Sequence, residues 1–405
     1  MNVFIIPSWY PSQNNALPGI FFREQAMAMA SQYKEFNFGI STWGQNDERL
    51  LLWGKKPLNS LSKFLLSNKP IPSVTMLSGE NIAELFTPTY TWTSKYLNGN
   101  FKKILKANLL NLEQFEVKFG KAHIIHAHVG YPAGYIAQNL SKVLGIPYSV
   151  TEHMSPFPHA QFLNKQNKLD HKLLLAYKYA STNICVSQNL ALQMNSFGIK
   201  NLITIPNLVD DLYYKPAVRS KNKIFTFFSL GRMVPQKGMD LLLTAFSKID
   251  KEAILRIGGD GDFIHKYKRL ATKLKIDHKV HWLAEIDKSR ALTEYQSCDA
   301  FVLPSRHESM GVVFAEAMAC GRPVIATICG GPEEFINADC GYLVEPENEK
   351  GLLQAMEKMM ENLSLFDPST IRKHFECRFS KQVVCKKIKD VYEFAVDSDR
   401  KKLSN

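Results

Sequence analysis

The feature that most constrains the fold of this chain is the alternation of short apolar runs with longer amphipathic stretches. Short apolar runs are typical of buried strands, and the stretches between them have the periodicity of helices. Strands and helices that alternate in this way form parallel sheets covered by helices. The sequence therefore predicts an α/β fold.

The apolar runs give the positions of the expected strands. In the first half these are residues 3–6, 37–41, 122–127, 148–151, 183–186 and 202–205, with a helix at about 20–31. In the second half they are residues 225–230, 254–257, 280–283, 300–303, 324–326 and 342–344. Helices are expected between the latter strands, at about 239–249, 264–274, 289–297, 312–319 and 349–362. The stretch 46–118 mixes basic and apolar residues and is expected to contain helices.

The length of 405 residues indicates two domains, because a domain usually has about 100–200 residues. A linker containing Asp, Pro and then basic residues lies near 207–220. We expect one Rossmann-like domain at 1–206, a second at 207–385, and a C-terminal helix and tail at 386–405 that packs back toward the first domain, with a frayed polar end from 397. Two facing domains of this kind leave a cleft between the carboxyl ends of their strands, where parallel sheets bind ligands.

Composition excludes several classes of protein. Hydrophobic residues make up 45% and charged residues 22%, which is ordinary for a globular protein and excludes collagen-like or disordered chains. No apolar run approaches the roughly 18 residues of a membrane span, and the start lacks the basic residues of a signal peptide, so a cytosolic location is expected. The seven cysteines form no CxxC pair, which favours reduced thiols over disulfides or a zinc site.

The net charge of +12 is unevenly distributed. Residues 1–205 hold 19 basic and 10 acidic side chains, so this half attracts phosphates, nucleic acid or an acidic membrane, and charge alone does not distinguish these partners. The segments 55–69 and 95–106 interleave Lys with Leu, Ile and Phe, which fits contact with an anionic bilayer. A solvated helix face is the alternative.

Two cations follow the strand expected at 225–230. Arg232 and Lys237 lie in the segment that leads into the next helix. A guanidinium can bind a diphosphate bidentately, and an ammonium at the helix entrance adds a point charge. The spacing is equally compatible with a solvated turn.

Two carboxylates follow the strand expected at 300–303. Glu308 falls in the loop and Glu316 in the following helix. The amides of Met310, Gly311 and Val312 come at the helix start, where free N–H groups suit an anion. A carboxylate can accept both hydroxyls of a vicinal diol, so the two acids suit sugars on either side of a diphosphate. Alternatively, Glu316 is an exposed helix residue.

The segment from Glu308 through seven residues to Glu316, continuing as AMACGRPVIA, resembles the signature of the retaining family-4 glycosyltransferases. The same resemblance extends to Gly231-Arg232, Lys237-Gly238 and residues 205–207, 330–334 and 341–344. It implies the GT-B architecture, in which two Rossmann-like domains face each other across a cleft.

The resemblance also implies roles for individual residues. Glu308 contacts hydroxyls of the donor sugar, and Glu316 contacts the ribose of the nucleotide. Arg232 and Lys237 hold the diphosphate. The amides at the helix start serve the sugar–phosphate region, where Met310 replaces the Phe that the family often has; only its backbone is needed.

The first half contributes Gly19 and His153. Gly19 allows close approach of the backbone at a helix start, and it resembles the family's loop that completes the diphosphate site. His153 follows the strand at 148–151, and the resemblance implies contact with the donor sugar or the reacting centre. Glu152 either orients His153 or is solvated. For Arg23 a surface cation, and for His128 a core imidazole, are open alternatives to a place near the cleft.

No metal or other cofactor is expected, since protein cations and amides stabilise the departing diphosphate. Asp260-Gly261-Asp262 has the spacing of a metal motif, but it follows two glycines after a strand, which favours a tight turn. Strand alternation puts His126 and His128 on one face and His123 on the other, which is poor geometry for a metal site.

Together these features predict transfer of a sugar, with retention, from a UDP- or GDP-linked donor to a hydroxyl of a glycan or lipid-linked acceptor. The resemblance implies a bacterial surface polysaccharide such as a capsule, an O-antigen or an exopolysaccharide, made at the inner face of the membrane. A nucleotide-sugar epimerase of the same architecture is the alternative. Charge alone suggests a nucleic-acid binder, which no recognised motif supports.

Overall fold

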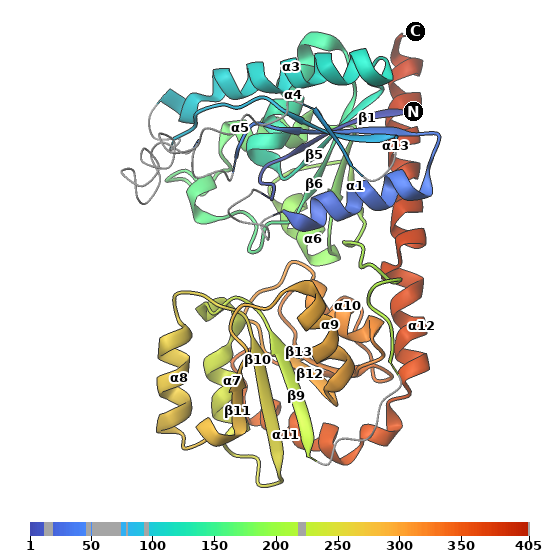
Figure 1. Cartoon of the computed structure of the whole chain (residues 1–405). Helices are drawn as coiled ribbons and strands as arrows, with labels where there is room; N and C mark the ends of the chain where they lie inside the picture. The colour runs from blue at the N-terminus through green and yellow to red at the C-terminus, as the bar shows by residue number, and fades with distance from the viewer. Residues whose placement is uncertain are drawn as a thin grey trace, which may run out of the picture. The chain divides into compact units, whose positions relative to one another are not determined.

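The computed structural model describes residues 1–11, 19–45, 50, 74–77, 80–92, 97–217 and 224–403, and the chain divides into two compact units (Figure 1). Unit 1 comprises Met1–Val186, Ala191–Ile205 and Cys385–Asn405. Unit 2 comprises Ser187–Leu190 and Pro206–Val384. Each unit has its own sheet and its own apolar core, as expected for an α/β fold.

Within the described residues, unit 1 contains an eight-stranded sheet in the order β3-β4-β2-β1-β5-β6-β7-β8. Strand β3 pairs antiparallel with β4, and the other neighbouring strands pair in parallel. The strands are β1 (Asn2–Pro7), β2 (Asn37–Thr42), β3 (Val74–Met76), β4 (Ile82–Phe86), β5 (Ile124–His128), β6 (Tyr148–Glu152), β7 (Thr182–Cys185) and β8 (Leu202–Thr204).

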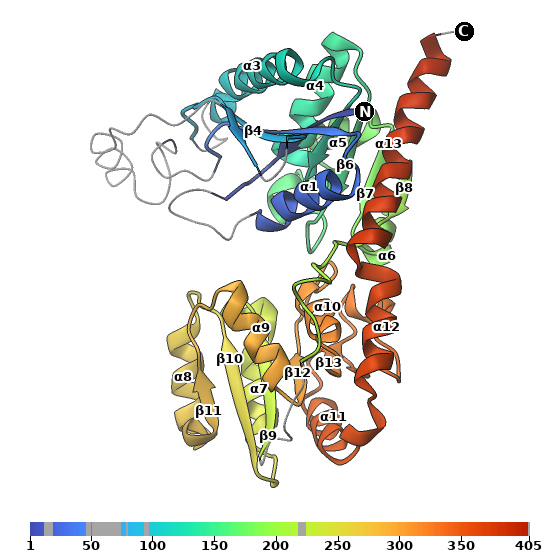
Figure 2. The same cartoon turned by 45° about the vertical axis from the view of Figure 1, so that its right-hand side comes forward.

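Helices cover both faces of this sheet (Figures 1 and 2). Helix α3 packs on β2 and against α4, and α1 also contacts β2 and β4. The helices are α1 (Ile20–Gln32), α3 (Phe101–Phe119), α4 (Tyr135–Leu144), α5 (His171–Lys178), α6 (Gln188–Ser196) and α13 (Lys381–Leu403), with short turns η1 (Leu97–Asn100), η2 (Gly130–Gly134) and η3 (Ala160–Phe162).

Unit 2 has a parallel sheet whose described strands, six in number, follow the order β11-β10-β9-β12-β13-β14. These are β9 (Phe225–Leu230), β10 (Ala253–Gly258), β11 (Val280–Trp282), β12 (Ala300–Leu303), β13 (Val324–Thr327) and β14 (Gly341–Val344). Their central residues are buried, which explains why the sequence shows continuous apolar runs there.

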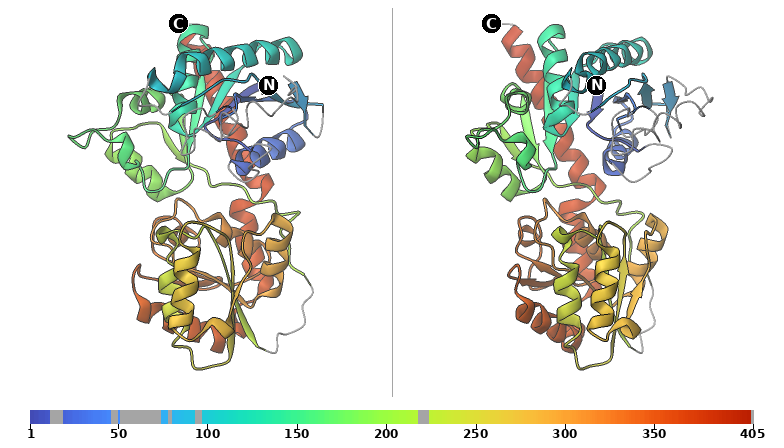
Figure 3. Two further views of the ribbon diagram at one scale, coloured as in Figure 1. Left: turned by 60° about the vertical axis from the view of Figure 1, so that its left-hand side comes forward. Right: turned by 90° about the vertical axis from the view of Figure 1, so that its left-hand side faces the viewer.

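The helices of unit 2 also lie in two layers (Figure 3). Helix α7 packs against α8 and α11, whereas α10 packs against α9 and α12. Their bounds are α7 (Met239–Phe246), α8 (Ile264–Lys273), α9 (Lys288–Ser297), α10 (Val312–Ala319), α11 (Glu349–Glu361) and α12 (Pro368–Phe379), with short turns η4 (Pro235–Lys237), η5 (Asp277–Lys279), η6 (Pro332–Glu334) and η7 (Leu363–Leu365).

Each sheet has one point at which its strand order reverses direction among the described strands. In unit 1 the chain builds outward from β1 through β2 to β4, and then from β5 through β6 to β8. In unit 2 it builds from β9 to β11 and then from β12 to β14. At such a switch point two neighbouring loops diverge at the carboxyl ends of the strands, and this opening is where ligands bind parallel sheets. A ligand site is therefore expected at the loops after β1 and β5 in unit 1 and at the loops after β9 and β12 in unit 2.

The stretch 46–118 contains helix α3, as expected, and it also contains strands β3 and β4, which were not expected; β4 carries Glu84 at its centre. Two expectations need correction. The tail from 397 onward continues helix α13 as far as Leu403 instead of fraying there. Glu152 is the last residue of β6 and is fully buried, so it is neither beyond the strand nor solvated. The segment 55–69 lies outside the described residues.

Candidate active site

Lys237 and Glu308 meet at the switch point of unit 2. Lys237 ends the loop after β9, and Glu308 lies in the loop after β12, the neighbouring strand. The Lys237 ammonium donates to Glu308 Oε1 at 2.6 Å, and the two side chains are only 15% and 8% exposed. Residues 71 positions apart therefore form a largely buried ion pair at the edge where ligands are expected.

The loops after β9 and β12 are in close backbone contact at Gly238 and Pro304. Gly238 has φ +65°, and a Cβ added there would lie 2.0 Å from the carbonyl oxygen of Pro304. Glycine is required by both the left-handed conformation and the lack of space. This contact keeps Lys237, the preceding residue, beside the loop that holds Glu308.

Arg306 fastens the same two loops. Its amide donates to the carbonyl of Gln236 at 2.7 Å, and the Gln236 side chain donates back to the carbonyl of His307 at 2.9 Å. Its guanidinium binds Asp240 at 3.0 Å and also binds Glu347. The hydrogen bonds that Arg306 donates to Asp240 and Glu347 raise its pKa, so it stays charged. Sequence analysis missed this residue because its partners, at 236–240 and at Glu347, lie far from it in the sequence.

One carboxylate oxygen of Glu308 accepts hydrogen bonds, and the other has none within the described part of the chain. Oε1 accepts from Lys237 and from the Ser305 hydroxyl, the latter at 2.7 Å. Oε2 has no hydrogen-bond partner within the described part of the chain. The Glu308 amide donates to the carbonyl of Cys329 at 3.3 Å, so the loop after β13 supports it. A fixed carboxylate with a free oxygen can accept a hydroxyl hydrogen bond.

Helix α10 begins as the sequence predicts. Gly311 caps it with φ +82°, and the amides of Met310, Gly311 and Val312 find no acceptor among the residues that the structure describes. The Met310 side chain is buried, and its sulfur accepts from the Asn207 amide at 3.2 Å. A Cβ on Gly331 would lie 2.6 Å from Met310 Cα, so both side chain and backbone of Met310 are packed. The interpretation that only its amide matters therefore missed a packing role.

Glu316 lies on α10, where Tyr295 of α9 donates to its Oε2 at 2.8 Å. The Glu316 side chain is partly exposed. Tyr295 is fully buried, and burial, followed by the charge of Glu316, raises its pKa well above the usual value, so the hydroxyl stays a donor. Tyr295 thus fixes the orientation of Glu316, and no motif pointed to it.

The Arg232 side chain is exposed and makes no hydrogen bond or ion pair within the described ranges, whereas its carbonyl accepts from the Val234 amide at 2.8 Å. The loop that carries Arg232 is held in place by contacts with the segment after β10. The Met233 amide donates to the carbonyl of Asp260 at 2.9 Å, and a Cβ on Gly259, which has φ +118°, would lie 2.0 Å from the carbonyl oxygen of Gly231. The segment 259–262 is therefore a tight turn packed on the loop after β9.

In unit 1 the start of α1, which follows β1, lies beside His153, the residue after β6. Gly19 precedes α1 with φ +75°, and an added Cβ would lie 2.5 Å from the Trp9 carbonyl oxygen. The rings of Phe21 and Phe22, in the first turn of α1, lie 5.0 and 5.1 Å from the ring of His153. Gly19 and His153, predicted from separate motifs, therefore belong to one cluster. Arg23 of the same helix binds Glu84 at 3.0 Å.

Glu152 holds the backbone that carries His153. Its Oε1 accepts from the amides of His153 and Met154 at 2.7 and 2.8 Å, and its Oε2 accepts from the Gly130 amide at 3.0 Å and from the Tyr177 hydroxyl. Glu152 therefore positions His153 through the main chain, not through its imidazole.

Three imidazoles gather at this edge. His126 and His128 have ring centroids 4.4 Å apart, as the strand alternation predicts, and His128 Nδ1 lies 3.4 Å from His153 Nε2. His123 accepts from the Asn2 amide elsewhere. Burial lowers the pKa of His126 and of His153 to about 3, and it lowers that of His128 well below its usual value. All three rings are therefore neutral near pH 7.

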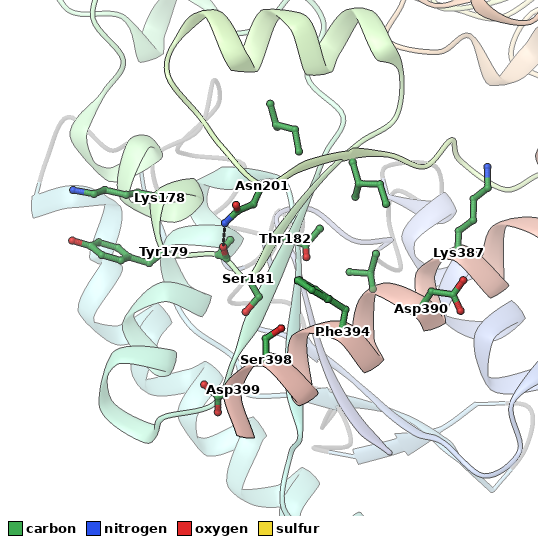
Figure 4. Close-up of a pocket in the computed structure, with 14 residues that line it drawn as sticks. Lys178, Tyr179, Ser181, Thr182, Asn201, Lys387, Asp390, Phe394, Ser398 and Asp399 are labelled. Carbon is green, nitrogen blue, oxygen red and sulfur yellow. Dashed lines mark hydrogen bonds between the residues drawn. The ribbon is translucent and has the colours of Figure 1, made fainter. Parts of the chain in front are cut away.

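A metal centre and a cavity in unit 1 are two other possible kinds of site. Within the described ranges, no group of three or more His, Cys, Asp or Glu side chains could hold a metal ion. A cavity of about 800 Å³ lies in unit 1 between α13 and the amino ends of β7 and β8 (Figure 4). Lys178, Tyr179, Asn201, Lys387 and Phe394 are among its lining residues, and none of the predicted site residues is.

The arrangement in unit 2 suits an anion flanked by polyols. The Lys237 ammonium has three N–H donors and uses one on Glu308. The amides at the start of α10 and the exposed Arg232 add further donors, which suit a diphosphate. Glu308 and Glu316 supply acceptors for hydroxyl groups.

Comparison with known proteins agrees with this chemistry. The family described as Glycosyltransferase Family 4 matches residues 84–211, and the family described as Glycosyl transferases group 1 matches residues 214–367. The boundary between the two matches falls in the linker region expected from the sequence.

Individual proteins show the same relationship. The chain is 28% identical over 319 residues to an uncharacterized glycosyltransferase of Methanocaldococcus jannaschii, covering 74% of this chain and 87% of that protein. It is 31% identical over 138 residues to the lipopolysaccharide core biosynthesis glycosyltransferase LpsE of Rhizobium meliloti, covering 34% of this chain and 40% of that protein.

Solved structures share the fold. Sucrose-phosphate synthase from Thermosynechococcus elongatus has a TM-score of 0.73 at 18% identity, covering 97% of this chain and 98% of that one. Anabaena HepE in complex with UDP-glucose has a TM-score of 0.69 at 17% identity, covering 97% of this chain and 99% of that one. The fold is thus that of the GT-B glycosyltransferases. The chain belongs to the family-4 glycosyltransferases, which confirms the resemblance seen in the sequence.

Proposed function

We propose that this glycosyltransferase moves a sugar, with retention at the anomeric carbon, from a nucleotide-diphosphate donor to a hydroxyl of a glycan or lipid-linked acceptor. The observation that carries the proposal is the Lys237–Glu308 pair at the switch point of unit 2. It sets a cation beside an acid with one open oxygen, next to unpaired helix amides.

In the proposed mechanism the bond from the anomeric carbon to the diphosphate oxygen breaks, and a bond from that carbon to the acceptor oxygen forms. Lys237, Arg232 and the amides of α10 stabilise the charge that develops on the leaving diphosphate. The leaving phosphate takes the acceptor proton. No metal or cofactor takes part in the proposed step, because these groups supply the positive potential.

The remaining donor contacts follow the same logic. Glu308 Oε2 accepts from hydroxyls of the transferred sugar, and Glu316 accepts from the ribose. Gly19 allows the donor diphosphate to approach the start of α1, and His153 contacts the donor sugar. UDP- and GDP-sugars are both candidate donors; the solved complex of HepE with UDP-glucose supports a nucleotide sugar of this kind.

The proposed acceptor is a bacterial surface polysaccharide or its lipid-linked precursor. The relative named for lipopolysaccharide core biosynthesis supports this choice, as does the net charge of +12, which favours an anionic membrane surface. We place the enzyme in the cytoplasm, at the inner face of the membrane.

The test is a transfer assay with a panel of sugar nucleotides and acceptors, with the product anomer read by NMR. Glu308→Gln and Lys237→Ala should each lower kcat about 100-fold or more. Lys251→Ala is the control, because it removes an exposed Lys–Glu pair of 2.7 Å from the same unit and should leave kcat unchanged. Full activity of either site variant would contradict the proposal. A product formed from the donor alone would indicate an epimerase instead.

A further inference from the structure

Tyr392, on helix α13, reaches the imidazoles at the carboxyl edge of the unit 1 sheet. Its hydroxyl oxygen lies 2.7 Å from His126 Nδ1, and His126 Nε2 lies 2.7 Å from Thr151 Oγ1. All three side chains are buried. The part of α13 in unit 1 runs alongside this sheet (Figure 2). His126 is thus held at both ring nitrogens, by α13 on one side and β6 on the other.

The protonation states of these groups determine which of them donates and which accepts in each hydrogen bond. Burial lowers the pKa of His126 to about 3 and raises that of Tyr392, so the ring is neutral and the phenol keeps its proton. A neutral imidazole has one N–H and one acceptor nitrogen. A phenol is intrinsically a stronger hydrogen-bond donor than an aliphatic hydroxyl, so donation from Tyr392 to Nδ1 is the expected arrangement. In that arrangement the His126 proton lies on Nε2, where Thr151 accepts it.

His126 in turn holds His128. Their ring centroids lie 4.4 Å apart, and Phe22 stacks on His128 at 4.5 Å with an interplanar angle of 29°. A ring with close aromatic neighbours of this kind has little freedom to rotate. Its Nδ1 is consequently kept 3.4 Å from His153 Nε2.

His128 and His153 form a coupled pair. Both rings are neutral, so one proton bridges the two facing nitrogens, and the two outer nitrogens must then comprise one donor and one acceptor. The outer nitrogen of His153, Nδ1, is buried and has no hydrogen-bond partner in the described part of the chain. A buried polar atom without a partner is costly, which points to a ligand that completes it.

We infer that Tyr392 and His126 are positioning residues, which fix the orientation and proton arrangement of the His128–His153 pair so that it offers one donor and one acceptor to hydroxyls of the sugar ligand. The identity of the ligand rests on the proposed function. The arrangement of the rings does not, and it can be tested without turnover.

The first experiment is ¹⁵N NMR of the histidine rings in the ligand-free protein at pH 7. The inference predicts His126 with its proton on Nε2, and a change of its nitrogen shifts in Tyr392→Phe, which removes the donor to Nδ1. A proton on Nδ1 of His126 in the wild type, or unchanged His126 shifts in Tyr392→Phe, would overturn it. This result stands even if no sugar nucleotide is turned over, so it separates the inference from the proposed function.

The second experiment compares Tyr392→Phe with Tyr148→Phe. Tyr148 is an equally buried tyrosine of unit 1, whose hydroxyl donates to the Ala176 carbonyl at 3.0 Å and contacts no imidazole among the residues that the structure describes. With a sugar-nucleotide donor, Tyr392→Phe should lower kcat about tenfold with little change in KM, as loss of a positioning hydrogen bond does. Tyr148→Phe should keep the wild-type kcat. Equal loss in both variants would show a general effect of packing and refute the role of Tyr392.

Discussion

At the scale of single residues, the two units bury polar groups in different ways. In unit 2 the Glu308 carboxylate is compensated by the Lys237 ammonium and the Ser305 hydroxyl. In unit 1 burial keeps the imidazoles of His126 and His153 neutral. The first arrangement holds opposite charges ready for an anionic ligand, and the second holds neutral hydrogen-bonding groups.

The ion pair allows structural and chemical roles to be separated. Lys237→Met should lower the free energy of unfolding by about 1–3 kcal/mol, because it leaves the buried Glu308 carboxylate without its cation. Adding Glu308→Gln should restore most of that stability, since the amide is uncharged and still accepts from Ser305. Neither variant should transfer sugar. Urea denaturation and the transfer assay measure the two effects. A double variant that recovers activity along with stability would show that the pair is only structural.

The neutral imidazoles make stability depend on pH. The pKa of His126 is about 3 in the folded protein and about 6.5 when unfolded, so between these values the unfolded chain binds a proton that the folded one does not. Stability is therefore lost as the pH falls through this window, by about 2 kcal/mol for this ring between pH 7.5 and 5. His126→Gln cannot titrate and should show a shallower pH slope in denaturation experiments. An unchanged slope would mean that His126 is charged in the folded state.

At the scale of elements, the apolar runs located most strands correctly because parallel strands are buried on both faces. Strands β3 and β4 were not predicted. In β4 the charged residue Glu84 interrupts the apolar run, and Tyr10 and Arg23 bind it in the sheet. Helix α13 runs further than its polar composition suggests, and Arg400 and Asp397 pair along its last turns at 3.8 Å.

The candidate site shows the same division. Residues that directly follow strands, such as Lys237 and Glu308, could be predicted because the carboxyl ends of parallel strands meet at one edge. Their supports could not. Tyr392 contacts His126 across 266 positions of sequence, and Arg306 joins segments far apart in the chain, so only the folded structure reveals them.

The close approach of the loops after β9 and β12 predicts an unusually costly glycine substitution. Gly145 and Gly238 have similar φ values of +70° and +65°, but an added Cβ meets nothing within 4 Å at Gly145 and lies 2.0 Å from a carbonyl at Gly238. Gly145→Ala should cost about 1 kcal/mol of unfolding free energy, and Gly238→Ala about 2–4 kcal/mol more. Gly238→Ala should also weaken donor binding, because the loop that carries Lys237 must move. Equal costs in denaturation experiments on the two variants would contradict the close approach.

At the scale of the whole molecule, charge is the feature that bears on location. No helix in the described part of the chain has both the length and the apolar character to cross a bilayer. In α3 the side chain of Ile104 is buried, whereas Lys102, Lys103 and Lys106 are exposed. In the described part of the segment 95–106, the side chains available to a membrane are therefore the charged lysines and not an apolar face.

Binding to vesicles should consequently be electrostatic. The full chain should float with vesicles that contain phosphatidylserine at low salt and should dissociate as the salt concentration rises, whereas neutral vesicles should not bind it. Replacing Lys102, Lys103 and Lys106 with Gln should weaken binding by about 1 kcal/mol per lysine that contacts the surface. Absence of binding to the anionic vesicles at low salt would rule out this proposal.

The most direct test is a crystal structure of the full chain with a bound sugar nucleotide. We predict that diphosphate oxygens lie about 3 Å from Lys237 Nζ and from the amides at the start of α10, with the transferred sugar at Glu308 and the ribose at Glu316. A nucleotide found instead in the cavity beside α13 (Figure 4), or anywhere away from the loops after β9 and β12, would contradict the account.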